Sequence, residues 1–193
     1  MRELERTPTH TSEPAQALPP IVVIGRGRVG GSVASAAAVA GLDVRQVGRD
    51  DLDAGCAEAE VALLCVPDGE IEAAAERVAA HAPSLRFVGH TSGATGLEVL
   101  ATATAAGALP FSMHPLQTVP DDRVSLAGAP AAIAGTDEEA VELARALADA
   151  LSMVPFEVAE DARVAYHAAA SIASNFLVAL EESAAGLLEA AAW

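Results

Sequence analysis

The sequence predicts an α/β fold: a doubly wound, mostly parallel β-sheet followed by the start of an all-α domain. Short apolar runs alternate with amphipathic helical patterns from residue 20 to residue 158, and this order is typical of parallel strands joined by helices. A glycine-rich turn follows the first apolar run. The pattern from residue 159 to residue 193 is helical, with no proline and a single glycine.

The strands and helices are expected after a disordered leader at residues 1–19, which lacks the apolar segment of a secretion signal. The strands are expected at Ile21–Ile24, Val44–Val47, Val61–Val66, Arg86–Gly89, Ala108–Ser112, Ala131–Ala134 and Val154–Val158. The helices are expected at Val29–Ala40, Glu70–Ala80, Leu97–Ala106 and Asp137–Leu151. The third strand is almost continuously apolar, as expected of a parallel strand that is covered on both faces.

Residues 20–158 are therefore expected to form one sheet domain, and residues 159–193 one long helix. A helix of roughly 30 residues extends about 45 Å, which is more than this sheet can cover. Either the helix packs on another subunit, or the chain is the front part of a longer protein. We favour the second reading.

Composition excludes several classes of function. The net charge of −16 argues against nucleic acid as a partner. No apolar stretch is long enough to span a membrane. Two cysteines, one of them inside an apolar strand, fit a reduced cytoplasmic setting. All 11 basic residues are arginines, so a lysine acid, base or Schiff base is ruled out.

The turn after the first strand carries glycines at the spacing of a dinucleotide site, namely Gly25, Gly27 and Gly30. In a Rossmann fold the first glycine permits the tight turn, the second lets the backbone approach a pyrophosphate, and the third lets helix and strand pack closely. Phosphates bind the helix N-terminus, here at Arg28 and Val29. The alternative is a purely structural strand–helix turn.

Arg49 ends the second strand about 20 residues beyond the glycines, where the ribose 2′ position is read. An arginine there pairs with a 2′-phosphate, whereas an acid accepts from a 2′-hydroxyl. The sequence therefore favours NADPH as the cofactor. NADH remains an alternative cofactor, because Asp50 and Asp51 lie close enough to accept from a ribose 2′-hydroxyl. Arg49 could instead be a solvated surface charge.

Three histidines lie where the substrate end of such a site is expected. His90 and His114 are expected in the loops that follow the fourth and fifth strands, at the edge of the sheet where ligands bind. His167, Ser171 and Asn175 recur every four residues on one face of the long helix. These side chains could hold a carbonyl group, or Ser171 and Asn175 could simply bond to a neighbouring helix. No short ligand spacing supports a metal site, and none is expected.

Five segments together carry a family resemblance: GRGRVGGSVA, VALLCVPDGEI, FVGHTSGATGLEVL, MHPLQTV and YHAAASIASNFLVAL. From about Ile21 to Leu180 the chain resembles Rossmann-like NADP oxidoreductases that carry a helical C-terminal domain of unknown function. They belong to the 6-phosphogluconate dehydrogenase-like group, together with ketopantoate and pyrroline-5-carboxylate reductases. The resemblance implies an NADP-binding domain and a helical domain that completes the active site and often forms dimers.

The chain departs from the resembling enzymes at one catalytic position. In β-hydroxyacid dehydrogenases and ketopantoate reductases, a lysine precedes the helix asparagine by four residues. Asn175 matches that asparagine, but Ser171 stands at the lysine position. A proton donor must then come from His167, His114 or His90, or turnover has been lost.

The function expected from these observations is NADPH-dependent reduction of a small carbonyl or imine, such as a 2-keto acid. Asn175 and Ser171 would orient the substrate, and Val66 and Pro67 would border the cofactor. Two alternatives remain open, a non-catalytic dinucleotide-binding module and a deazaflavin:NADP hydride-transfer enzyme.

Overall fold

A computed structural model provides the structure of residues 18–48, 51–52, 56–82 and 84–191. Almost all of the leader expected at residues 1–19 lies outside the described residues, and so does Arg49.

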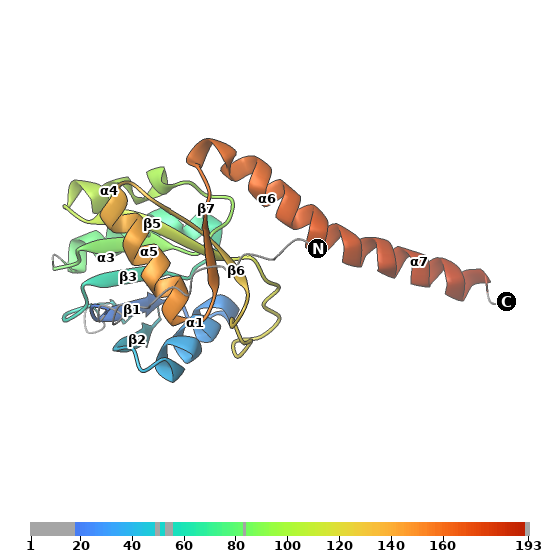
Figure 1. Ribbon diagram of the computed structural model, residues 1–193, viewed down its shortest axis with the longest axis horizontal. Coiled ribbons are helices and arrows are strands. Elements are labelled where there is room, and N and C mark those ends of the chain that lie inside the picture. Colours follow the sequence, from blue (N-terminus) through green and yellow to red (C-terminus); the bar gives the residue numbers. More distant parts are fainter. Residues whose placement is uncertain (1–17, 49–50, 53–55, 83, 192–193) are drawn as a thin grey trace, which may run out of the picture.

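A seven-stranded sheet forms the centre of the fold (Figure 1). The strands follow the order β2-β1-β3-β4-β5-β6-β7. Neighbouring strands from β2 to β5 pair in parallel, β6 runs antiparallel to β5, and β7 is parallel to β6. This confirms the mostly parallel α/β sheet. The strands are β1 Ile21–Ile24, β2 Val44–Val47, β3 Val61–Leu64, β4 Phe87–His90, β5 Leu109–Pro115, β6 Pro130–Gly135 and β7 Val154–Glu157.

The fifth strand is longer than predicted, and this changes the place of His114. The segment from residue 116 to residue 129 joins β5 to β6 without a helix, so β6 can return antiparallel to β5. Pairing of His114 with Ala132 and of Pro115 with Ala131 extends β5 to Pro115. His114 therefore lies within a strand and not in the loop that the sequence predicted, because its strand partner is supplied by a distant segment.

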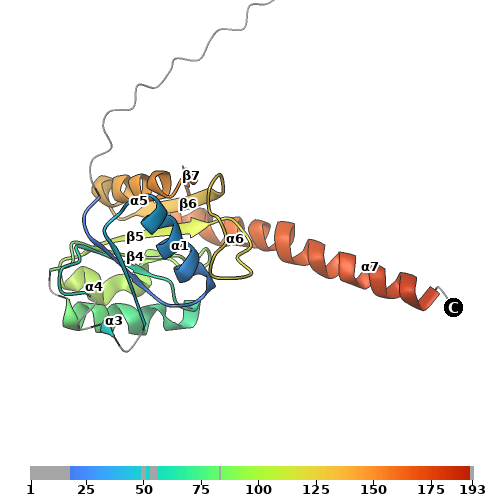
Figure 2. The same ribbon diagram turned by 90° about the horizontal axis from the view of Figure 1, so that it is seen from below.

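Helices cover both faces of the sheet (Figure 2). Helices α1 (Arg28–Val39) and α5 (Glu138–Ala150) lie on one face, and α3 (Ile71–His81) and α4 (Ala101–Ala105) lie on the other. Alternate residues of β1 serve the two faces: Val23 packs in the cluster under α1 and α5, and Val22 packs in the cluster under α3. Burial on both faces explains the continuous apolar strands that the sequence shows.

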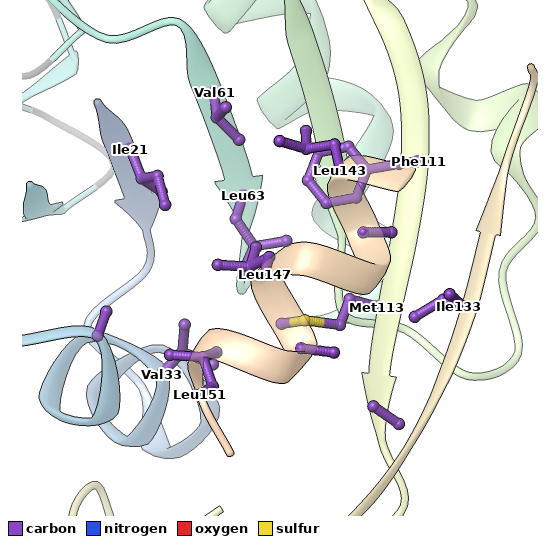
Figure 3. Packing of buried hydrophobic residues seen from close by; sticks show 14 of the residues in the cluster. Ile21, Val33, Val61, Leu63, Phe111, Met113, Ile133, Leu143, Leu147 and Leu151 are labelled. Atoms are coloured by element: carbon purple, nitrogen blue, oxygen red, sulfur yellow. The ribbon is translucent and has the colours of Figure 1, made fainter. Parts of the chain in front are cut away.

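Helix α5 supplies much of the apolar cover on its face of the sheet (Figure 3). Leu143 and Leu147 pack in the cluster that holds the buried Phe111 and Met113 of β5. Burying a side chain of this size stabilises a fold by about 1.5–3 kcal/mol. The helix begins where the side chain of Asp137 accepts a hydrogen bond from the backbone N–H of Ala140 at 2.9 Å, an N-cap that satisfies a helix-end donor.

The C-terminal segment is one continuous helix that leaves the body of the domain (Figures 1 and 2). After a short 3₁₀ turn at Glu160–Ala162 it runs as α6 (Arg163–Ser171), a π-helical turn (Ile172–Phe176) and α7 (Leu177–Ala191). The long helix was predicted, but the π-helical turn was not. None of the residues of α7 is buried, and several large apolar side chains are exposed on the π-helical turn and α7: Ile172, Phe176, Leu177, Val178, Leu180, Leu187 and Leu188. Within the described ranges, no helix is both long enough and apolar enough to cross a bilayer.

Candidate functional site

The glycine turn between β1 and α1 is shaped by close backbone packing. Gly25 adopts a φ of +128°, and a Cβ atom there would lie 2.2 Å from the carbonyl oxygen of Cys65. A Cβ atom on Gly30 would lie 2.2 Å from the carbonyl oxygen of Gly25. A Cβ atom on Gly27, by contrast, would meet no atom within 4 Å. Gly25 and Gly30 are thus required by packing, whereas Gly27 borders open space.

Gly27 is also the N-cap of α1, and no side chain caps that helix. Backbone N–H groups in a first helical turn have no partners within the helix, and they attract anions. The open approach over Gly27 therefore leads to free donors. Arg28 and Val29 form the start of the helix on the same side, and both line the cavity described below.

The end of β2, where a ribose would be read, carries charges of both signs. The guanidinium group of Arg26 forms an ion pair with Asp51 at 2.9 Å, and both side chains are more than half exposed. Gln46 donates a hydrogen bond of 2.9 Å to the carbonyl oxygen of Gly25, which ties β2 to the glycine turn. The predicted contact of Arg49 with a 2′-phosphate falls outside the described residues.

A cavity of about 630 Å³ joins this turn to the carboxyl ends of the next strands and to the C-terminal helix. Five segments of the chain, far apart in sequence, form its walls. The first turn of α1 contributes Arg28 and Val29, and the segment after β3 contributes Asp68. The segment after β4 contributes Thr91, Ser92 and Gly93, and the end of β5 with its following loop contributes residues 114–119. The C-terminal helix contributes His167, Ala170, Ser171, Ala173 and Ser174.

His114 lies in the wall of this cavity and is held by its neighbours. Its Nδ1 atom is 2.8 Å from the hydroxyl oxygen of Tyr166 on α6. Gly93 lies against the ring, since a Cβ atom there would be 2.6 Å from the Cε1 atom of His114. Burial, and then the nearby His167 and Arg163, lower the pKa of His114 to about 4. At neutral pH this imidazole is therefore uncharged.

The helix contributes two further predicted residues to the same cavity. The rings of His167 and His114 have centroids 6.1 Å apart, and the Nε2 atom of His167 is 3.5 Å from the hydroxyl oxygen of Ser171. The buried Nδ1 atom of His167 has no hydrogen-bond partner among the described residues. Asn175 lies in the π-helical turn, and its side chain is not described.

Val66 and Pro67 follow β3, next to Asp68, but neither is among the residues that line the cavity. His90 is also outside the cavity: it is completely buried at the end of β4, where its Nε2 atom is 3.3 Å from the carbonyl oxygen of Gly96. The structure therefore separates His90 from His114 and His167, although all three were predicted as candidate site residues. No group of three metal-ligating side chains suited to a metal ion occurs in the described parts of the chain.

A buried arginine fixes the start of α6 on the sheet. Arg163 donates a hydrogen bond of 2.9 Å to the hydroxyl oxygen of Ser112 on β5, and it forms an ion pair with Glu160. Glu160 also accepts a hydrogen bond of 3.4 Å from the backbone N–H of Leu97. These contacts place Tyr166 and His167, one turn further along, over the end of β5. Sequence analysis missed Arg163, Asp68 and Tyr166, and only the adjacency of Tyr166 to His167 could have drawn attention to one of them.

The buried His90 gives a prediction about stability. Burial, and then the charge of Arg163, lower its pKa to about 4. An unfolded chain takes up this proton near pH 6.5, so protonation favours the unfolded state as the pH falls from 6.5 towards 4. The unfolding free energy of the unaltered protein should therefore fall by roughly 3 kcal/mol more than that of His90→Gln between pH 7.5 and pH 4.5.

Urea unfolding at the two pH values measures this difference. His81→Gln, at an exposed position on α3, is the control, and it should keep the pH dependence of the unaltered protein. If His90→Gln also keeps that dependence, His90 is not the neutral, buried group that the structure shows.

Two domain families match the chain. Residues 43–115 match a Rossmann-like domain, and residues 129–193 match a domain of unknown function, DUF2520. The second match begins ahead of the domain boundary that the sequence suggested at residue 158. A search of curated proteins found no match.

Solved structures share the fold. A protein named as an NADP oxidoreductase, from Bacteroides fragilis, matches with a TM-score of 0.74 and 21% identity over 90% of this chain and 73% of its own. Pyrroline carboxylate reductase of Plasmodium falciparum with NADP bound matches with a TM-score of 0.68 and 11% identity, over 90% and 71%. An NADH-preferring ketol-acid reductoisomerase from an uncultured archaeon gives 0.69 and 16%, over 91% and 62%.

Proposed function

Because the chain joins a Rossmann-like domain to a DUF2520 domain, we propose that it is an NADPH-dependent oxidoreductase that reduces a small carbonyl or imine, such as a 2-keto acid. One observation carries the proposal. A single cavity runs from the uncapped start of α1 to His114, His167 and Ser171. A site of this kind can hold a diphosphate at one end and the reacting group of a substrate at the other.

The residues at the first end fit a dinucleotide. Gly27 leaves room for a phosphate to reach the N–H groups of α1, and Arg28 adds positive charge beside it. Val29 lines the same wall, and Val66 and Pro67, in the segment after β3, would border the cofactor beside the cavity. Arg49 and Arg26 would meet a 2′-phosphate. When bound, the nicotinamide would supply the hydride.

The residues at the second end fit a carbonyl or imine. His114, uncharged at neutral pH, can donate a hydrogen bond to a developing negative charge without first needing an added proton. His167, Ser171 and Asn175 would orient the substrate along the helix. Ser171 cannot replace a lysine as a charged acid, so His114 carries the polarising role in this proposal. His90 is too deeply enclosed to touch a substrate in this cavity.

The relatives' names support the cofactor class. Two of the three similar structures are named with NADP, and the third is named NADH-preferring. This fold therefore holds both nucleotides, and the choice rests on the charges at the end of β2. The exposed apolar side chains of α7 support the proposal that the protein forms a homodimer through its helical part.

Calorimetric titration with NADPH and NADH tests the cofactor. NADPH should bind about tenfold more tightly, because an arginine–phosphate hydrogen bond contributes about 1.5–3 kcal/mol. Arg49→Ala and Arg26→Ala should each weaken NADPH binding and leave NADH binding unchanged.

Arg86→Ala is the matched control, since it removes the same charge just before β4, at the amino ends of the parallel strands and away from the carboxyl ends that border the cavity. It should bind both nucleotides normally. Equal affinity for the two nucleotides in the unaltered protein would contradict the choice of NADPH, and binding of neither would contradict the proposed function.

A further inference from the structure

The contact between Tyr166 and His114 links the helical segment to the sheet at the substrate end of the cavity. The hydroxyl oxygen of Tyr166 and the Nδ1 atom of His114 are 2.8 Å apart, an ordinary hydrogen-bond distance. Neither domain match nor the sequence motifs assign a role to Tyr166. Its role as inferred below rests on the proposed function, because it acts through His114.

The direction of this hydrogen bond decides which ring nitrogen of His114 carries the proton. A neutral imidazole has one donor and one acceptor nitrogen, and a phenol can donate or accept. If Nδ1–H donated to Tyr166, the phenol proton would need another acceptor. Among the described residues, His114 is the only hydrogen-bond partner that Tyr166 has. Burial raises the pKa of Tyr166, so the phenol keeps its proton. The arrangement that satisfies both groups by contacts within the described part of the protein has Tyr166 donating to Nδ1.

The proton of His114 then lies on Nε2, and that nitrogen is the one left for a ligand in the cavity. We propose that Tyr166 is a positioning residue that holds His114 in the Nε2–H tautomer, so that Nε2 donates a hydrogen bond to the oxygen or nitrogen atom that gains charge in the substrate. In the other tautomer Nε2 would be a bare acceptor facing that charge, and it would repel it.

The surroundings of both rings favour a fixed geometry. The rings of His114 and Tyr166 meet edge to face at 83°, and the ring of Phe156 on β7 packs on Tyr166 with centroids 5.9 Å apart. The groups whose charge acts on His114 come from three elements: His167 and Arg163 on α6, Asp68 after β3, and His90 on β4. Among the described residues, none of these groups forms a hydrogen bond with the His114 ring, so within that part of the chain Tyr166 is the group that selects the tautomer.

Nitrogen-15 NMR of the histidine side chains tests the inference without any substrate. In the unaltered protein at pH 7.5, His114 should show a protonated Nε2 and an unprotonated Nδ1, with no second form. Tyr166→Phe keeps the ring and loses the hydroxyl, and His114 should then become a mixture in which the Nδ1–H form is measurable. The signals are assigned by their loss in His114→Gln.

Phe156→Leu is the matched control, because it loosens the packing around Tyr166 but keeps the hydroxyl. It should retain the single Nε2–H form. A proton on Nδ1 in the unaltered protein would overturn the inference, and this reading holds even if Tyr166→Phe does not fold. An unchanged single Nε2–H form in Tyr166→Phe would equally overturn it.

The proposed function is tested by nucleotide binding, a different measurement from the NMR of His114. If neither nucleotide binds, the reductase is rejected, whereas the tautomer measurement stands by itself. In an active protein, Tyr166→Phe should lower kcat/KM for the substrate about tenfold and leave NADPH affinity unchanged, because the hydroxyl acts only on His114.

Discussion

Gly27→Ala is expected to bind NADPH at least tenfold more weakly than the unaltered protein and to unfold at the same temperature. The new methyl group meets no protein atom within 4 Å, and the backbone at Gly27, with a φ of −78°, suits any residue. Two small effects on stability oppose each other, since alanine is a poorer N-cap than glycine but loses less conformational entropy on folding, so the unfolding temperature should hardly change. The methyl group occupies the space through which a phosphate would approach the N–H groups of α1, and displaced hydrogen bonds to a charged group cost about 1.5–3 kcal/mol.

Calorimetric titration and thermal unfolding measure the two halves of this result. Gly186→Ala on α7 also adds a methyl group with no atom within 4 Å, and it should bind NADPH normally. Gly25→Ala should behave in the opposite way to Gly27→Ala: it places a Cβ atom 2.2 Å from a carbonyl oxygen at a φ of +128°, and such strain costs about 1–3 kcal/mol or more. Normal NADPH affinity in Gly27→Ala would show that no phosphate approaches this turn.

His114→Gln is expected to lower kcat/KM for the substrate about 100-fold, which is the usual scale for losing a positioned donor at a developing charge. The affinity for NADPH should not change, because His114 lies at the other end of the cavity from the glycine turn. NADPH oxidation is measured against a panel of 2-keto acids and cyclic imines, with a reduced deazaflavin as a separate arm followed by its absorbance.

The outcome separates the three functions that the sequence left open. His81→Gln, exposed on α3, should retain full turnover as the control. Turnover that is unchanged in His114→Gln would reject the role of His114. Binding of NADPH without consumption of any carbonyl or imine would favour a non-catalytic module, and oxidation of the deazaflavin alone would favour hydride transfer between the two cofactors.

Much of the fold could be predicted because its signals are local. Short apolar runs predicted the strands, and burial under helices on both faces explains why β1 and β3 show no alternation of apolar and polar residues. The glycine spacing predicted the turn at Gly25, and the structure supplies the steric reason. The direction of β6 could not be predicted, since it depends on pairing with β5 across a connection that has no helix.

The candidate site was predicted only in part. His114, His167 and Ser171 meet in the cavity as the sequence suggested, whereas His90, which had the same local signal, is enclosed beneath the segment that follows β4. The assignments of Arg49 to a 2′-phosphate and of Asn175 to the substrate stay predictions. Nothing in the sequence marked Arg163, because its importance comes from burial against Ser112 on a distant strand.

The sequence by itself determined the order of strands and helices along the chain, the tight turn at the glycines and the exclusion of lysine chemistry. These three features depend on side-chain periodicity, on backbone sterics and on residue type, respectively. Only the tertiary structure decided which histidine reaches the cavity, that His114 is uncharged, and that Tyr166 bonds to it. Burial and hydrogen bonding between segments 52 residues apart set those properties, and no local pattern encodes them.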